Sequence, residues 1–159
     1  MNRQVIAIMD FSNFTPQDIF HFSIYFFIFM VILGIAANIR RNIRVKKLAN
    51  GAIEVTPSEF FTLKKNSQTF PGVYLLYNHT KKMYYIGQSK SVYSRVNNHF
   101  TGHGNGDVYA DYKYGDEFTI RLIALKGSGF KTLNELERNA IAAYRAYDKG
   151  YNKTRGNKG

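Results

Sequence analysis

The sequence predicts an α+β fold, namely a small domain with a three-stranded antiparallel sheet flanked by helices, preceded by one transmembrane helix. Two observations lead to this prediction. Residues 19–39 form a run of 21 residues without Lys, Arg, Asp or Glu. After residue 70, segments rich in β-branched and aromatic residues alternate with segments whose apolar residues recur at helical spacing. We therefore expect a membrane anchor over residues 1–47, a linker over 48–69 and a folded domain over 70–159.

The composition favours a folded, basic protein. The chain has 159 residues, 45% of them hydrophobic, and its 22 Lys and Arg against 11 Asp and Glu give a formal net charge of +11. It contains no cysteine, which excludes disulfides, cysteine-ligated zinc, iron–sulfur clusters and a thiol nucleophile. Eleven of its 12 tyrosines follow residue 70. A basic, tyrosine-rich chain predicts a polyanionic partner, either a nucleic acid or an anionic membrane surface.

The apolar run 19–39 has the length of a membrane span. As a helix it would extend about 32 Å, close to the thickness of the hydrocarbon layer of a bilayer. A basic flank over 40–47 follows it, and the positive-inside rule places this flank and the C-terminal domain in the cytoplasm. A cleaved signal peptide, a buried core helix and an interfacial helix are the alternatives that the sequence leaves open. The basic residues are Arg40, Arg41, Arg44, Lys46 and Lys47.

Residues 48–69 are expected to connect the anchor to the domain. Gly51, Pro57 and Ser58 interrupt any apolar periodicity there. The stretch 58–63 is compatible with a short helix that Ser58 caps.

Three strands are expected in the domain. Residues 72–77 and 82–87 flank a polar turn and predict a β-hairpin, and residues 118–125 predict a third strand. The glycine-rich stretch 102–107 does not follow a strand and lacks the lysine of a phosphate-binding loop, so we expect it to be a flexible loop.

The predicted helices place three ionisable side chains at defined positions. Helical spacing over 92–99 places Arg95 and His99 on one face, four residues apart. A second helix begins after Thr132 and turns Glu137 toward its apolar stripe. A buried carboxylate is costly unless a cation neutralises it. A solvent-exposed Arg–His pair and a structural ion pair of Glu137 are the simpler alternatives.

The order of residues in this domain resembles that of the GIY-YIG nuclease family. Gly72-Val73-Tyr74 and Tyr85-Ile86-Gly87 are similar to the two signature strands, and Tyr85 lies eleven residues after Tyr74. The later markers follow in the family's order and spacing, and the resemblance covers about residues 70–155. These markers are Arg95, His99, Glu137 and Asn152.

The resemblance implies an enzyme that hydrolyses phosphodiester bonds of DNA with a divalent metal, Mg²⁺ or Mn²⁺. It implies that Glu137 binds the metal and that Arg95 binds the scissile phosphate. Tyr74 is the implied general base, and Tyr85 orients the attacking water or shares that role. His99 is either a proton relay to Tyr74 or a phosphate contact. The implied supporting residues are Gly72, Gly87 and Asn152.

Two positions depart from the family pattern. Val73 stands where isoleucine is usual, which changes only packing, and Gln88 stands where some relatives carry a lysine, which removes one phosphate contact. The sequence reaches Gly159 without a separate recognition domain, so we expect contacts to the DNA backbone and little sequence specificity.

The expected function is therefore that of a membrane-anchored, metal-dependent endonuclease at the cytoplasmic face of a membrane. Its expected partners are DNA and, through residues 19–39, the lipid bilayer. A catalytically inactive, membrane-tethered DNA-binding or interaction protein is the alternative.

Overall fold

A computed structural model of the chain describes residues 15–65 and 68–157. The chain divides into two compact units, residues 1–39 and residues 40–159. Helix α1 (Pro16–Gly51) contributes residues to both units.

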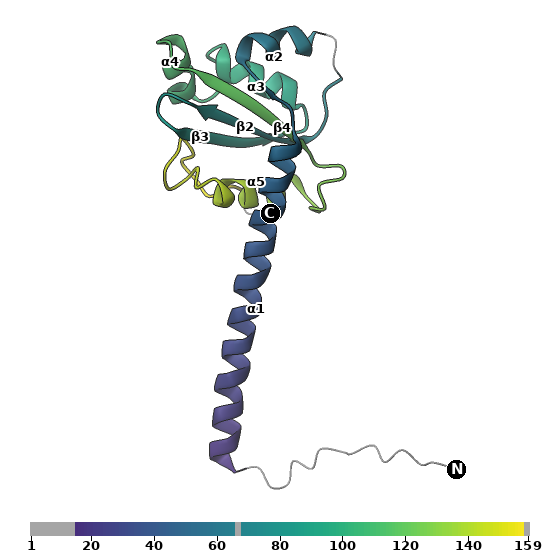
Figure 1. Cartoon of the computed structure of the whole chain (residues 1–159), viewed down its shortest axis with the longest axis vertical. Helices are drawn as coiled ribbons and strands as arrows, with labels where there is room; N and C mark the ends of the chain where they lie inside the picture. The colour runs from purple at the N-terminus through teal and green to yellow at the C-terminus, as the bar shows by residue number, and fades with distance from the viewer. Residues whose placement is uncertain (1–14, 66–67, 158–159) are drawn as a thin grey trace, which may run out of the picture. The chain divides into compact units, whose positions relative to one another are not determined.

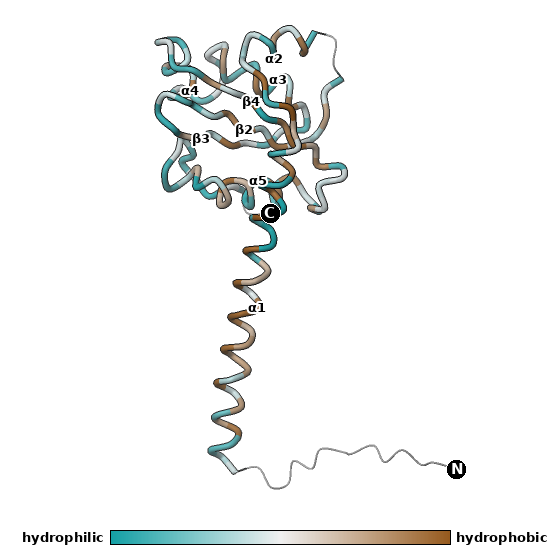
Figure 2. The backbone as a smooth tube through the Cα atoms, in the orientation of Figure 1, coloured by the Kyte–Doolittle hydropathy of each residue, from teal (hydrophilic) through white to brown (hydrophobic). Residues whose placement is uncertain are grey.

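In the first unit, α1 presents apolar side chains to its surroundings. Its most apolar 18-residue window has a mean hydropathy of 2.4, and none of that window is buried. Figure 2 shows the brown, hydrophobic residues along this part of the helix. By length and composition the segment suits a membrane span, and a signal sequence shares these properties. At the start of the helix the Thr15 backbone N–H donates to the Asp18 carboxylate at 3.0 Å.

In the second unit, an antiparallel sheet has the strand order β1-β4-β2-β3 (Figure 1). Strands β2 (Gly72–Asn78), β3 (Met83–Ser89) and β4 (Phe118–Ala124) match the three predicted strands to within two residues at each end. Strand β2 is central and pairs with both β3 and β4.

The prediction of three strands is wrong by one, because β1 (Glu54–Val55) adds a fourth at the edge beside β4. Two residues are too few to show the alternation that identifies a strand. Side chains hold β1 in place, since the Glu54 carboxylate accepts hydrogen bonds from Thr119 at 2.6 Å and from Arg121 at 2.8 Å.

Helices cover both faces of the sheet. Helices α2 (Pro57–Lys64), α3 (Val92–Phe100) and α4 (Gly106–Lys113) lie on one face, and α5 (Leu133–Ala143) lies on the other (Figure 1). The apolar core on the α5 face consists of Val45, Ala49, Val73, Leu75, Ile86, Ile123, Phe130, Leu136, Ala140, Ile141 and Ala146.

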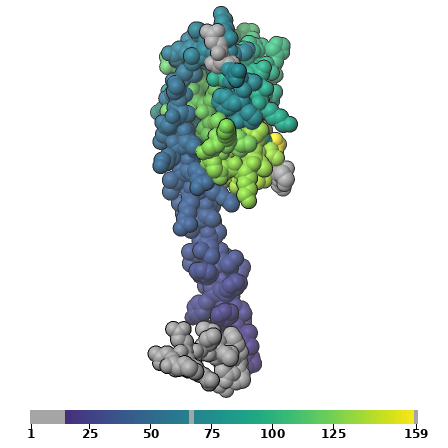
Figure 3. All heavy atoms as spheres, turned by 90° about the vertical axis from the view of Figure 1, so that its right-hand side faces the viewer, coloured from purple at the N-terminus to yellow at the C-terminus, as the bar shows by residue number. Residues whose placement is uncertain are grey.

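The end of α1 belongs to this second unit. Val45 and Ala49 lie one helical turn apart and are both fully buried. The Arg44 guanidinium donates to the Gly129 carbonyl at 3.2 Å. Figure 3 shows this end of α1, in blue, beside the green segment that follows β4. Residues 40–51 are therefore part of the domain's fold.

Helix α2 starts one residue before the predicted position, and Thr56 caps it in place of Ser58. The Thr56 hydroxyl accepts from the Glu59 N–H at 3.3 Å, and the Glu59 carboxylate accepts from the Thr56 N–H at 2.7 Å. Pro57 suits the first helical position because its missing N–H would have no partner there. Thr56 and Glu59 lie three residues apart and bind each other's backbone N–H groups. Ser58 has no such partner, so Thr56 is the preferred cap.

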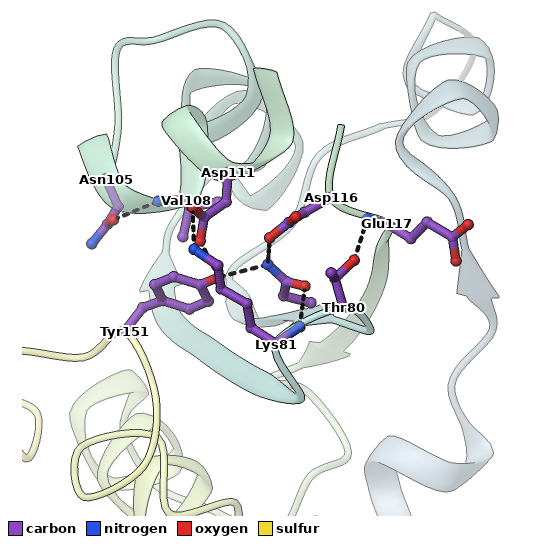
Figure 4. Close-up of polar contacts among 9 residues, drawn as sticks. Thr80, Lys81, Asn105, Val108, Asp111, Asp116, Glu117 and Tyr151 are labelled. Atoms are coloured by element: carbon purple, nitrogen blue, oxygen red, sulfur yellow. Dashed lines mark hydrogen bonds and ion pairs between the residues drawn. The ribbon is translucent and has the colours of Figure 1, made fainter. Parts of the chain in front are cut away.

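A polar network joins the β2–β3 turn to α4 and to the C-terminal segment (Figure 4). The buried Asn78 amide donates to the Asp116 carboxylate and to the Tyr151 hydroxyl, both at 2.7 Å. The Tyr151 hydroxyl donates to Asp111 at 2.6 Å, and Asp111 also pairs with the Lys81 ammonium at 2.5 Å. Each buried polar group thus has a partner, which makes the network compatible with a folded core.

Candidate active site

The central strand β2 places Tyr74 inside the domain. Alternation along the strand turns Tyr74 toward the α3 face, and its side chain is 1% exposed. Across the sheet Tyr74 lies opposite Gly87. A Cβ atom at Gly87 would overlap the Tyr74 hydroxyl, and one at Gly72 would overlap the Ile123 carbonyl oxygen. Gly87 is therefore needed for close packing on the tyrosine, and Gly72 for the close approach of β2 to β4.

Tyr85 from β3 and His99 from α3 meet Tyr74 on this face. The ring centroids of the two tyrosines are 6.2 Å apart, and those of Tyr85 and His99 are 4.8 Å apart. The His99 Nε2 atom lies 2.9 Å from the Tyr74 hydroxyl oxygen, which is hydrogen-bond distance. His99 is fully buried, so this bond is shielded from water.

Helix α3 positions Arg95 beside this cluster. Its apolar residues Val92, Val96 and Phe100 are buried and anchor the helix on the sheet. Arg95 is exposed, one turn before the buried His99. Its guanidinium interacts with the Tyr74 hydroxyl and is exposed enough to contact a ligand at the surface.

Burial and charge decide the protonation of the cluster. Burial raises the pKa of Tyr74 and of Tyr85, and the positive charge of Arg95 opposes both shifts. Burial, with a further contribution from Arg95, lowers the pKa of His99 to about 4. All three side chains are therefore neutral at pH 7, and Arg95 is the cation that favours a tyrosinate.

Glu137 approaches from α5, the helix on the opposite face of the sheet. It is 8% exposed, and its Oε2 atom accepts a hydrogen bond from the Gln88 side chain at 2.9 Å. Gln88 also donates to the Asn134 side chain at 2.5 Å. The negative charge of Glu137 raises the pKa of Tyr85, so the carboxylate and the tyrosine interact across the edge strand β3.

The surroundings of Glu137 suit a divalent cation. Within residues 15–65 and 68–157, no Lys or Arg forms an ion pair with this largely buried carboxylate. Among the same residues there is no group of three or more His, Cys, Asp or Glu side chains close enough together to hold a metal ion. Mg²⁺ is commonly bound by one or two carboxylates and completes its shell with water and phosphate oxygens. One carboxylate with a neutral amide partner fits that mode.

Asn152 ties the C-terminal segment to β3. Its side chain donates to the Ile86 carbonyl at 2.7 Å and accepts from the Ile86 N–H at 2.9 Å. The neighbouring Tyr151 N–H donates to the Tyr84 carbonyl at 2.9 Å. Ile86 lies between Tyr85 and Gly87, so these bonds hold the strand that carries the second tyrosine.

The structure thus brings together the residues that the sequence singled out. Tyr74, Tyr85 and His99 are in contact, Arg95 acts electrostatically on all three, and Glu137 acts on Tyr85. Their catalytic roles stay predictions.

The sequence does not identify Gln88 as a member of this site. Its position in the family pattern indicates only a lost phosphate contact, yet in the structure it donates a hydrogen bond to Glu137. The two-residue period of a strand is the pattern that could have indicated this contact. It turns Gln88 toward the α5 face of β3 and Tyr85 toward the opposite face.

Comparison with known proteins gives one match. The family described as the GIY-YIG catalytic domain matches residues 70–152, which are 83 of the 159 residues. No curated protein and no solved structure matches the chain.

Proposed function

This chain belongs to the GIY-YIG family of nucleases, and on that premise we propose that it is a membrane-anchored, divalent-metal-dependent endonuclease that cuts DNA with little sequence specificity. The observation that carries the proposal is the convergence of Tyr74, Tyr85, His99 and Arg95 on one side of β3, with Glu137 interacting across it. Hydrolysis of a phosphodiester needs an activated water, charge stabilisation on the phosphoryl group and assistance to the leaving oxygen.

In this proposal one tyrosine of the pair, once ionised, accepts the proton of the attacking water. Burial keeps both as hydroxyls in the free enzyme, so one must first ionise. Tyr85 is the less buried of the two, and Arg95 and the Tyr74 hydroxyl both lower its pKa against the effect of burial. Tyr74 orients the water or shares the proton through its contact with Tyr85.

Arg95 binds the scissile phosphate. Its guanidinium is exposed and always charged, and it offers two parallel N–H donors to phosphate oxygens. The same charge lies close enough to the tyrosines to favour their ionised form. A single side chain thus couples substrate binding to activation of the base.

Glu137 holds the divalent metal, and Gln88 orients the carboxylate. When bound, Mg²⁺ or Mn²⁺ would supply Lewis-acid stabilisation of negative charge on the phosphoryl and leaving oxygens. Gln88 donates a neutral hydrogen bond, so Glu137 keeps its full charge for the cation.

The basic character of the domain supports a nucleic-acid substrate. Residues 69–159 contain 14 Lys and Arg and 7 Asp and Glu, a net charge of +7. Phosphate contacts supply affinity without reading the sequence. Cleavage of a random-sequence DNA library should give dispersed cut sites, and one dominant motif would contradict this part of the proposal.

The decisive experiment is nicking of a supercoiled plasmid by the full chain in detergent, with Mg²⁺ or Mn²⁺. Glu137→Gln and Arg95→Ala should each lower the rate by about 10²–10³-fold, as expected for the loss of one transition-state charge contact. Arg138→Ala on the exposed side of α5 is the matched arginine control and should stay close to wild type. DNA binding without cleavage by the wild type would favour the non-catalytic alternative, and cleavage that survives Glu137→Gln would remove the metal assignment.

The apolar run and its basic flank support a membrane anchor with the nuclease domain in the cytoplasm. An integral membrane protein should stay in the membrane fraction after alkaline extraction and leave it only in detergent. The intact mass of the purified protein separates an anchor from a signal sequence, because a cleaved chain would lack residues 19–39. Digestion of a C-terminal tag by external protease would contradict the cytoplasmic orientation.

A further inference from the structure

The turn that follows α3 folds back over His99. At the end of the helix the Thr101 hydroxyl donates to the Asn97 carbonyl at 3.0 Å, and the His103 N–H donates to the Asn98 carbonyl at 2.9 Å. Two residues later the Asn105 N–H donates to Nδ1 of His99 at 2.8 Å. The imidazole therefore has a backbone partner on one ring nitrogen and a tyrosine on the other.

These two contacts define the hydrogen positions on His99. A ring nitrogen that accepts from a backbone N–H carries no hydrogen itself, so Nδ1 is unprotonated. His99 is fully buried and neutral at pH 7, so its single ring hydrogen is on Nε2. Nε2 lies 2.9 Å from the Tyr74 oxygen, which must accept this hydrogen.

Gly104 makes the contact with Asn105 possible. A Cβ atom at residue 104 would overlap Nδ1 of His99 and lie 2.8 Å from its Cα atom. Any side chain there would push the following peptide, which carries the Asn105 N–H, away from the ring. The glycine-rich stretch 102–107, expected to be a flexible loop, thus packs directly on a buried side chain.

Helix α4 holds Asn105 from the other side. The Asn105 side chain caps this helix by accepting from the Val108 N–H at 3.0 Å, and Val108 is fully buried. One residue therefore caps α4 through its side chain and orients His99 through its backbone.

We propose that the turn of Gly104 and Asn105 is a positioning element that fixes His99 as the Nε2–H tautomer, so that His99 donates a hydrogen bond to Tyr74 and does not accept its proton. The proposal rests on the proposed function and deepens it, because the sequence left a proton relay and a phosphate contact open for His99. A hydrogen bond donated to the Tyr74 oxygen leaves the hydroxyl hydrogen of Tyr74 for Tyr85, the tyrosine that is proposed to ionise. The groups that face His99 are Tyr74 from β2, Tyr85 from β3 and Arg95 from its own helix.

The first test needs no activity. The full chain, labelled with ¹⁵N-histidine and held in detergent micelles, is examined at pH 7.5 by long-range ¹H–¹⁵N correlation. The signal that disappears in His99→Gln should show an unprotonated Nδ1 and a protonated Nε2. The opposite tautomer, or a doubly protonated ring, would overturn the proposal.

The second test uses two glycines of the same turn. Gly104→Ala should mix the His99 tautomers and lower kcat about tenfold or more with little change in KM. Gly106→Ala is the matched control, because a Cβ atom there meets nothing within 4 Å, and it should leave both readouts unchanged. Loss of activity in Gly104→Ala with an unchanged tautomer would overturn the proposal.

The proposed function and the tautomer of His99 can be refuted independently. A wild-type chain that shows the Nε2–H tautomer but cuts no DNA refutes the proposed function and leaves the tautomer assignment intact. A chain that cuts DNA with the Nδ1–H tautomer refutes only the positioning role of the turn.

Discussion

The two faces of the central sheet bury different kinds of side chain. On the α5 face the buried side chains form a large apolar cluster, to which α5 adds the buried carboxylate of Glu137. On the α3 face the buried layer also contains Tyr74, His99 and Asn78, each with a hydrogen-bond partner. One strand, β2, contributes alternate residues to both layers.

The contrast separates stability from chemistry. Apolar packing on the α5 face can hold the sheet without restricting the direction of any polar group. On the α3 face each buried polar atom needs a specific partner, because an unsatisfied one costs about 1–3 kcal/mol. Substitutions in the apolar cluster and substitutions among the buried polar groups should therefore affect different measurements.

The largest effect is expected at Tyr74. Tyr74→Phe removes one hydroxyl and should lower the cleavage rate by about 10³-fold, because the tyrosine pair loses a proton-transfer partner. The free energy of unfolding should fall by about 1–3 kcal/mol, because the buried His99 Nε2–H loses its acceptor. Plasmid nicking and thermal unfolding of the same preparation measure both quantities. A variant with nearly wild-type cleavage would show that the hydroxyl has no catalytic role.

The adjacent residue should behave in the opposite way. Leu75 is 1% exposed on the α5 face, and Leu75→Ala should lower the free energy of unfolding by about 2–5 kcal/mol. Nicking measured well below the unfolding midpoint should stay within a fewfold of wild type. A selective loss of cleavage in the still-folded variant would show that the apolar cluster also affects catalysis.

His99 should make stability depend on pH. Its pKa is about 4 in the folded chain, below the 6.5 of an unperturbed histidine, so the unfolded state binds a proton first as the pH falls. The contribution of the neutral His99 to the free energy of unfolding is therefore fully present above pH 6.5. It is lost as the pH falls toward 4, and the loss is at most about 3 kcal/mol. Thermal unfolding between pH 7.5 and 5 should show this decline in the wild type and a weaker one in His99→Gln. Equal slopes in the two proteins would contradict the buried neutral histidine.

Gln88 should affect the metal requirement. Gln88→Leu removes the donor to Glu137 and should raise the Mg²⁺ concentration for half-maximal nicking by about 10- to 100-fold, as for other partners of metal ligands. The exposed Gln68→Leu is the matched control. An unchanged Mg²⁺ dependence in Gln88→Leu would separate this glutamine from metal binding.

The smallest effect is expected at the edge of the sheet. Glu54 and Arg121 form a partly exposed ion pair at 2.8 Å. Glu54→Gln should change the free energy of unfolding by less than about 1 kcal/mol, because solvent screens such pairs. A larger loss of stability would indicate that the two-residue strand β1 supports the core.

Local patterns were sufficient for most of the fold. The turn between 77 and 82 and the alternation on either side predict β2 and β3, and the Thr132 cap predicts the start of α5. Strand β1 is missed because its two residues pair through the side chain of Glu54, a contact that no local pattern contains.

The residues of the candidate site also fall into those that the sequence identifies and those that only the fold brings together. Ordered markers along the chain identify Tyr74, Tyr85 and Arg95 without any structure. The contacts of Gln88 with Glu137 and of Asn105 with His99 depend on segments that meet only after folding. A glycine at 104 gives no sign in the sequence that a histidine ring lies against it.

The hydrogen bonds between Asn152 and Ile86 also bear on how the domain avoids self-association. Strand β3 lies at one border of the sheet, where free backbone groups invite pairing with another molecule. The asparagine amide occupies both polar groups of Ile86 in the manner of an additional strand. At the other border, β1 is only two residues long and presents little backbone for such pairing. Asn152→Ala would uncover the N–H and carbonyl groups of Ile86 as a template for intermolecular β-pairing.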